Sequence, residues 1–170
     1  MKAISSWHVG VAAEAFVAAL FARLGYDVSV QYGANQPEYD LIAVSGDKML
    51  KISVKGSQDG GWGLTQNYKK GCDYQEAIQK WLSNHHKKTI FYLVQFKGTE
   101  DHEMPRMYLA SPVEIAKVLK KSAGGRGETI LYEYHEWGPC AAGRGTIDRV
   151  PDEWGFTAER AKDMFETYGQ

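Results

Sequence analysis

Three side chains suited to hydrolytic chemistry fall on one face of a short hairpin predicted from the sequence. Residues 40–44 (Asp-Leu-Ile-Ala-Val) and 49–55 (Met-Leu-Lys-Ile-Ser-Val-Lys) read as alternating strands, and a Gly-Asp pair between them favours a tight turn. With this pair at the tip, Asp40 lies directly opposite Ser53. Because side chains alternate between the faces of a strand, Asp40, Ser53 and Lys55 share one face. A carboxylate, a hydroxyl and an amine placed together are consistent with a metal-assisted hydrolytic site.

Two further carboxylates can join this face. Glu38 precedes the hairpin and falls opposite Lys55 in the same alternation. Glu14 lies in a helix predicted from a serine cap at position 5 or 6 to residue 24, and it flanks the apolar stripe of that helix. A helix docked on the sheet would aim Glu14 at the rim of the sheet, whereas a solvated helix face is the alternative. The predicted apolar stripe consists of Val9, Ala13, Phe16, Leu20 and Leu24.

This arrangement resembles the active-site motif of the PD-(D/E)XK nuclease superfamily over roughly residues 8–98. The motif places an aspartate on one strand and an acid-X-lysine triplet on the next, usually with a glutamate from a preceding helix. Asp40, Lys55 and Glu14 fall on the aspartate, the lysine and the helical glutamate. The motif also arrives in the expected order of helix, hairpin and following elements, which is the context that a short motif requires.

The sequence departs from the motif at Ser53, which stands where the superfamily has its second acid. Some restriction enzymes of the superfamily also carry serine there, with an acid relocated to the following helix. Asp73 or Glu76 would have to serve in that case. Glu38 is a nearer candidate, and with Pro37 it is similar to the proline–acid element of the motif. The sequence does not decide between these alternatives.

The resemblance implies a divalent-metal-dependent nuclease, and specifically a DNA endonuclease using Mg²⁺ or Mn²⁺. Asp40 and Glu14 would hold the ion together with the backbone carbonyl of Val54, because Mg²⁺ prefers oxygen ligands. Lys55 would orient the attacking water or stabilise the developing negative charge. A homodimer would suit cleavage of both strands. The alternative is a nuclease fold with impaired catalysis that binds nucleic acid or another protein, and Ser53 is the main reason to consider it.

The net charge of −1 means that nucleic acid would have to bind through local patches. One candidate patch lies in a glycine-rich segment, residues 56–71, which is predicted to be irregular. It combines the stacking faces of Trp62 and Tyr68 with the charges of Lys69 and Lys70. A solvated loop is the alternative interpretation.

The remaining pattern predicts one α/β domain over residues 1–170, with a restriction endonuclease-like three-layer core. A mixed central sheet would be flanked by helices in the order α-β-β-β-α-β. Capping boxes predict helix starts at Asp73 and Ser111. The other predicted elements are a strand over 26–32, a turn over 33–37, a buried central strand over 89–96, strands over 107–110 and 129–134, and a helix over 157–168.

Cysteine usage and hydropathy place further limits on the class of protein. Cys72 and Cys140 are far apart and show no metal-ligand spacing, which is typical of free thiols in a reducing compartment. No segment approaches the roughly 20 apolar residues of a membrane span, and the first residues lack the pattern of a signal peptide. We therefore expect a cytoplasmic protein without membrane contacts.

Overall fold

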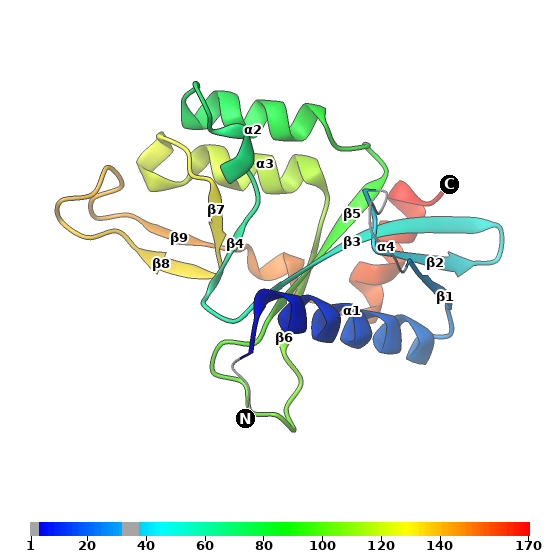
Figure 1. The fold of residues 1–170 in the computed structure, drawn as a ribbon. Coiled ribbons are helices and arrows are strands. Elements are labelled where there is room, and N and C mark those ends of the chain that lie inside the picture. The colour runs from blue at the N-terminus through cyan, green and yellow to red at the C-terminus, as the bar shows by residue number, and fades with distance from the viewer. Residues whose placement is uncertain (1–3, 32–37) are drawn as a thin grey trace.

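A five-stranded mixed sheet occupies the centre of the computed structural model (Figure 1). The structure describes residues 4–31 and 38–170, so the predicted turn over 33–37, with Pro37, lies outside the described residues. The strand order is β1-β2-β3-β5-β6, and every neighbouring pair is antiparallel except β3 and β5. The strands are β1 (Asp27–Val30), β2 (Leu41–Ser45), β3 (Lys48–Ser57), β5 (Thr89–Gln95) and β6 (Arg106–Ala110).

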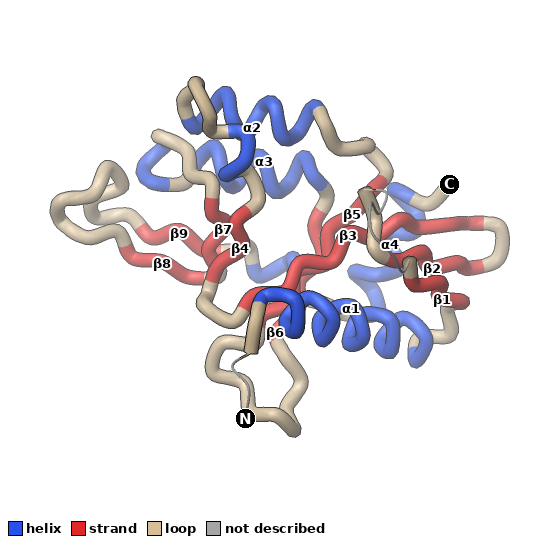
Figure 2. Tube along the Cα trace, viewed as in Figure 1, coloured by secondary structure: helices blue, strands red, loops and turns tan. Residues whose placement is uncertain are grey.

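Helices cover both faces of this sheet, which gives three layers (Figure 2). α1 (Ser6–Arg23) and α4 (Ala158–Tyr168) share one buried apolar cluster with the sheet. α2 (Tyr74–Ser83) and α3 (Pro112–Lys121) share a second cluster on the opposite face. The predicted three-layer core, a mixed sheet flanked by helices, is confirmed, and its elements follow the predicted α-β-β-β-α-β order with β4 added before α2. The predicted buried strand over 89–96 corresponds to β5, which is buried throughout but is fourth in the strand order.

Two small sheets extend the α2–α3 side of the molecule. β4 (Gly61–Gly63) pairs with β7 (Ile130–Tyr132), and β8 (Tyr134–Glu136) pairs with β9 (Ile147–Arg149) in a ribbon that projects from the body (Figure 1). The prediction of an irregular segment from residue 56 to 71 is therefore wrong in part, because β3 continues to Ser57 and β4 follows. The strand predicted over 129–134 is interrupted at Glu133. Short 3₁₀ helices span Gln66–Tyr68, Ala123–Gly125 and Asp152–Trp154.

Side-chain caps begin three of the helices where the sequence places them. The Asp73 carboxylate accepts the backbone N–H of Glu76 at 2.8 Å, and the Ser111 hydroxyl accepts that of Glu114 at 3.3 Å. Thr157 caps α4 in the same way. Among the helices of the described residues, none is long and apolar enough to cross a membrane.

The buried face of α1 is rotated relative to the predicted one. Val9 and Ala13 are buried as predicted, but the next two inward positions are Val17 and Phe21. The prediction is wrong for Phe16, Leu20 and Leu24, of which Leu24 is 39 % exposed. Buried positions spaced by four residues follow one ridge of the helix, and the sheet surface selects this ridge. Glu14 remains beside the buried face, next to Ala13.

The predicted register of the hairpin is confirmed. Leu41 pairs with Ile52, and Ser45 pairs with Lys48 across the tip. The backbone N–H of Asp40 donates to the carbonyl of Ile52 at 2.8 Å, so the chain is already fastened to β3 one residue before β2 begins. Asp40 therefore stands at the end of the ladder, beside residues 53–55.

Close packing of α1 on β3 depends on Gly56. A Cβ atom at this position would lie 2.8 Å from the carbonyl oxygen of Val9 and 3.0 Å from the Cβ of Ala13. Neither the backbone carbonyl of Val9 nor the buried Cβ of Ala13 can move aside easily. This glycine thus sets how near α1, and with it Glu14, comes to the end of the hairpin.

We predict that Gly56→Ala destabilises the fold by about 1–3 kcal/mol, because α1 must shift away from β3. The matched control is Gly10→Ala in α1, where a new Cβ would meet nothing within 4 Å. That variant should gain about 0.5–1 kcal/mol from helix propensity. Urea unfolding of both variants measures the contrast. Equal stability of the Gly56 variant and the parent would contradict this account of the packing.

Candidate active site

Asp40 is held against β3 by its carboxylate. Oδ2 of Asp40 accepts the backbone N–H of Val54 at 2.6 Å and lies 3.4 Å from Oγ of Ser53. Nζ of Lys55 lies 4.0 Å from the same oxygen, and the Lys55 side chain is 43 % exposed. Asp40, Ser53 and Lys55 are therefore brought together, as the sequence predicts.

Glu14 lies on α1, the helix that covers one face of the sheet, and its carboxylate is close enough to Asp40 and Lys55 for their charges to influence it. Partial burial is the largest influence on its carboxyl and raises its pKa, and the nearby negative charge of Asp40 raises it further. The positive charge of Lys55 acts in the opposite direction. The structure thus places two carboxylates and one ammonium within electrostatic range at the rim of the sheet.

The backbone of Val54 adds an oxygen at the same edge. In an antiparallel ladder, the N–H and C=O of one residue point to the same edge of the strand. The N–H of Val54 points to Asp40, so its carbonyl also faces the edge that β2 leaves uncovered beyond Leu41. This supports the prediction that the carbonyl is available as a ligand.

Ser53 is enclosed rather than open to the rim. It is 2 % exposed, and its hydroxyl points to Asp40. The residue pairs with Phe91 of β5, which belongs to the apolar cluster under α2 and α3. Its present role is to contact the Asp40 carboxylate, with no negative charge of its own.

The proposed substitutes for the missing second acid have other partners. Glu38 does not belong to β2, and its Oε1 accepts the backbone N–H of His86 at 2.7 Å, so its predicted place opposite Lys55 is wrong. Asp73 and Glu76 cap the start of α2 through each other's backbone N–H groups. Each of these carboxylates therefore has a structural role at its own position.

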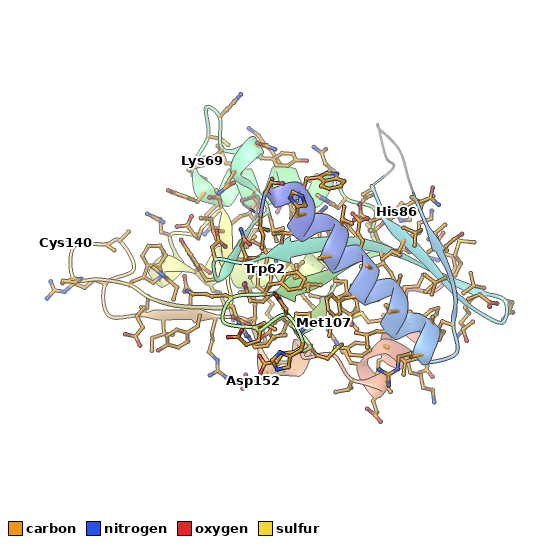
Figure 3. All side chains as sticks on the ribbon, turned by 60° about the horizontal axis from the view of Figure 1, so that its bottom comes forward. Trp62, Lys69, His86, Met107, Cys140 and Asp152 are labelled. Carbon is orange, nitrogen blue, oxygen red and sulfur yellow. The ribbon has the colours of Figure 1, made fainter. Side chains whose placement is uncertain are left out.

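The predicted aromatic and basic patch does not form as expected. Trp62 is 2 % exposed and donates its indole N–H to the carbonyl of Val94 at 3.3 Å, so the prediction that it stacks on a base is wrong. Tyr68 packs partly against the α2–α3 cluster. Nζ of Lys69 donates to the carbonyl of Cys72 at 2.9 Å, whereas Lys70 is exposed. Lys69 and His86, which lie before and after α2 in the sequence, are well apart in Figure 3.

A groove of about 310 Å³ begins at Lys55 and follows the last residues of β3 to Ser57. Ser6 at the start of α1 lines one wall, and Ser57 and Asp59 line another. The Ser57 hydroxyl donates to the Asp59 carboxylate at 2.8 Å. The sequence analysis missed these residues, although Ser57 continues the alternation of Ser53 and Lys55 and could have been found from it.

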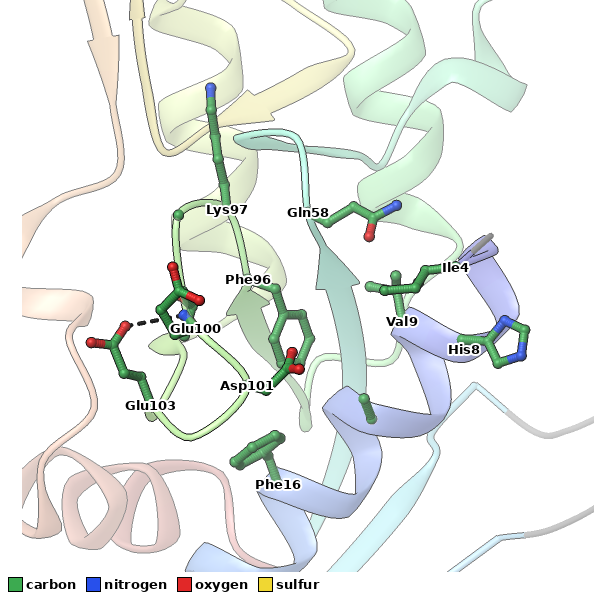
Figure 4. A pocket seen from close by; sticks show the side chains of 13 residues that line it. Ile4, His8, Val9, Phe16, Gln58, Phe96, Lys97, Glu100, Asp101 and Glu103 are labelled. Carbon is green, nitrogen blue, oxygen red and sulfur yellow. Dashed lines mark hydrogen bonds between the residues drawn. The ribbon is translucent and has the colours of Figure 1, made fainter. Parts of the chain in front are cut away.

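A larger pocket of about 520 Å³ lies on the other side of the first turns of α1 (Figure 4). Its floor is apolar, and Phe16 and Phe96 meet there with ring centroids 5.9 Å apart. Three carboxylates stand on its rim, on the turn between β5 and β6, whereas the Lys97 head points away. They belong to Glu100, Asp101 and Glu103. The pocket is acidic and contains none of the predicted catalytic residues.

The groups at the rim suit a hard divalent cation. Glu14, Asp40 and the Val54 carbonyl are all oxygen donors, and Mg²⁺ commonly uses one or two carboxylates together with waters and substrate phosphates. Burial raises the pKa of Glu14 most, and the negative charge of Asp40 raises it further; a bound cation would relieve this second contribution. Across residues 4–31 and 38–170, however, no three His, Cys, Asp or Glu side chains cluster as a metal site. The donor set fits a cation that shares its coordination with water and substrate.

Comparisons with known proteins find a similarity among solved structures only. No protein family model matches the sequence, and no curated protein is similar to it. Among solved structures, the chain is similar to Hjc, a Holliday junction resolvase from the archaeal hyperthermophile Archaeoglobus fulgidus. The two share 15 % identity with a TM-score of 0.40, over 73 % of this chain and 88 % of the other.

We predict a pH-dependent effect of Glu14→Gln on stability. The raised pKa means that the folded chain binds this proton more tightly than the unfolded chain, so stability falls as pH rises through the titration. The variant should raise the melting temperature at pH 7 by about 1–3 °C. Near pH 4 and below, where the parent carboxyl is mostly protonated, the two should melt alike.

The control for this measurement is Glu159→Gln on the exposed surface of α4. It removes the same formal charge from an exposed site and so controls for the change in total charge. Thermal melts of the parent and both variants from pH 4 to pH 8 would test the prediction. An equal shift at every pH would mean that Glu14 does not feel its acidic neighbour.

Proposed function

We propose that this chain is a divalent-metal-dependent nuclease, and specifically an endonuclease that hydrolyses phosphodiester bonds in DNA. The observation that carries the proposal is the convergence of Asp40, Lys55 and Glu14 at one rim of the sheet. These three groups come from a strand end, a neighbouring strand and a helix. The core around them has the order that the resemblance to the PD-(D/E)XK superfamily predicts. We further propose that residues 1–170 act as one nuclease-like domain.

Each residue would have a distinct part in the reaction. Asp40, Glu14 and the Val54 carbonyl would hold Mg²⁺ or Mn²⁺, which when bound supplies an activated water and neutralises phosphate charge. Lys55 lies within 4.0 Å of Asp40 and is partly exposed, so its ammonium can contact a phosphate oxygen or orient the water. Ser53 would hold the Asp40 carboxylate in place from its buried side.

The course of the groove supports binding of an extended strand. It begins at Lys55 and continues along Ser57 toward β4, so a chain with its scissile phosphate at the rim could continue past Ser6. The exposed hydroxyl of Ser6 on this path can donate to a phosphate oxygen, which positions a strand without reading its sequence. A homodimer with two such sites would suit cleavage of both strands of a duplex.

One observation favours a second candidate, a nuclease fold with impaired catalysis that binds nucleic acid or protein. Ser53 is buried at the position of the second acid, and Glu38, Asp73 and Glu76 are engaged elsewhere. Two carboxylates would bind a cation more weakly than three. The two candidates differ in one property, which is metal-dependent hydrolysis.

We predict that Lys55→Ala lowers the rate of Mg²⁺-dependent cleavage of plasmid DNA by about 10²–10³-fold, because the cation nearest the reacting phosphate is lost. The fold should remain intact, since a partly exposed ion pair contributes about 0–1 kcal/mol. Lys48→Ala at the hairpin tip is the matched control on the same strand and should cleave at the parent rate. Cleavage by the Lys55 variant at the parent rate would remove this lysine from the mechanism.

We predict that Ser53→Asp makes stability depend on divalent metal. The new carboxylate would be buried beside Asp40, so without metal the variant should melt several degrees below the parent. Mn²⁺ at 100 times its dissociation constant should return about 2.7 kcal/mol through linkage. The control is Ser53→Asn, which has a similar shape and no charge. A melting temperature of the aspartate variant that ignores Mn²⁺ would contradict a metal site here.

A further inference from the structure

Charge is distributed unevenly between the helical layers. Residues 66–88 and 111–129, which form α2, α3 and their flanking loops, contain nine Lys or Arg and four Asp or Glu residues. The rest of the chain contains 11 Lys or Arg and 17 Asp or Glu residues. A chain with a net charge of −1 thus combines one layer of formal charge +5 with a remainder of −6. The near-neutral total conceals a strongly basic surface.

Lysine side chains on α2, on α3, in the loop after α2 and on the neighbouring strand β3 make up what we call the basic track. Lys120 of α3 donates from Nζ to Oε1 of Gln79 at 2.8 Å, and Lys80 follows Gln79 in α2. Lys87 and Lys88 follow the end of α2 and are exposed. Most of the track is exposed, and Lys51 and Lys120 are half-buried. The basic track consists of Lys51, Lys80, Lys87, Lys88, Lys117, Lys120 and Lys121.

The basic track leads to the candidate active site. Lys51 pairs in register with Thr89, the residue after Lys88, and it shares a face of β3 with Lys55. The backbone N–H of His86 is bound by Glu38, two residues before Asp40. The loop after α2 is therefore fastened to the segment that leads into Asp40.

Acidic side chains face other directions. The carboxylates on or beside this layer are engaged in hydrogen bonds: Glu38 binds the backbone N–H of His86, and Asp73 and Glu76 form a capping box at the start of α2. Glu114 of α3 is paired with Arg160 of α4 at 2.8 Å. The rim of the pocket in Figure 4 and the exposed face of α4 are acidic. A polyanion approaching the molecule is thus attracted to one layer and repelled from the other.

The helix dipole explains only part of this pattern. Cations are favoured in the last turn of a helix, which accounts for Lys80, Lys120 and Lys121. It does not account for Lys117, one turn earlier, or for the lysines that follow α2 beyond its end. The surplus points to an external partner with negative charge.

We propose that the basic track binds the phosphate backbone of double-stranded DNA and brings one strand to the rim at Asp40 and Lys55. The assignment of the rim rests on the proposed function. Binding of single strands relies on exposed aromatic rings, and among the described residues the exposed large apolar side chain of this layer is Val113, which is aliphatic. The wide major groove of B-form DNA admits a helical element between its phosphate strands, whereas that of duplex RNA is deep and narrow.

The test is equilibrium binding of a fluorescent 24-base-pair DNA duplex in EDTA, followed by anisotropy from 50 to 200 mM salt. The track variant is Lys87→Gln, Lys88→Gln and Lys117→Gln combined. The control is Arg23→Gln, Lys48→Gln and Lys162→Gln combined, which removes the same formal charge from exposed sites outside the track. The track variant should bind about 10–100-fold more weakly at 100 mM salt, and its salt slope should fall by about 2–3, because each lost phosphate contact contributes about 0.9. The control should bind within about threefold of the parent, because none of its three charges belongs to the track that contacts phosphates in this proposal.

Each result supports or overturns the proposal. If both variants bind the duplex equally weakly, only the total charge matters. If the track variant binds as tightly as the parent, the track does not contact DNA. Either result overturns the proposal. Tighter binding of duplex RNA or of single-stranded DNA by the parent would overturn the choice of partner. Plasmid cleavage by the parent with Mg²⁺ separates the two claims. If DNA binding depends on the track but the parent does not cleave, the DNA-binding surface is supported and the nuclease function is contradicted. If the parent cleaves but binding does not depend on the track, the nuclease function is supported and the DNA-binding surface is contradicted.

Discussion

The candidate site depends on one backbone contact, the hydrogen bond from the N–H of Val54 to the carboxylate of Asp40 at 2.6 Å. β2 starts at Leu41, so beyond Ile52 the side of β3 that faces β2 has no partner strand, although β5 still pairs with its other side. The Asp40 side chain takes the place of a strand there. This substitution satisfies a backbone donor that would otherwise be unpaired at the edge. It also fixes the carboxylate beside Lys55 and leaves the Val54 carbonyl facing the same opening. A charged side chain that completes a sheet is thereby positioned for chemistry.

The second constraint is the approach of α1 to the sheet. Gly56 permits the helix to contact β3 at Val9 and Ala13, and Glu14 follows directly on that contact. Partial burial and the neighbouring charge of Asp40 raise the pKa of Glu14, so the folded chain holds two carboxylates that repel each other. Arrangements of this kind are costly and are retained where a cation or a reaction uses them. The packing of α1 on β3 therefore also determines the electrostatic environment of the two carboxylates at the rim.

Sequence patterns predicted the local features of this fold well. The Gly-Asp turn and strand alternation fix the hairpin register, so the meeting of Asp40, Ser53 and Lys55 could be foreseen. Capping boxes at Asp73 and Ser111 likewise define helix starts from neighbouring residues alone.

Features that depend on distant contacts were not predictable in this way. The inward ridge of α1 is chosen by the sheet it meets, and Trp62 is buried because β4 folds against the α2–α3 cluster. Glu38 binds His86, which is 48 residues away. The separation of charge between layers is visible in the sequence only once the layers are known.

The central claim is that Glu14, Asp40 and the Val54 carbonyl hold a divalent cation. A crystal of the protein soaked in Mn²⁺ tests it most directly, because the anomalous signal locates the ion without assumptions about its ligands. The account predicts a peak at the rim of the sheet, with oxygen atoms of both carboxylates at about 2.0–2.4 Å. A soaked crystal with no peak there, or with its main peak at the acidic pocket beside α1, would contradict it.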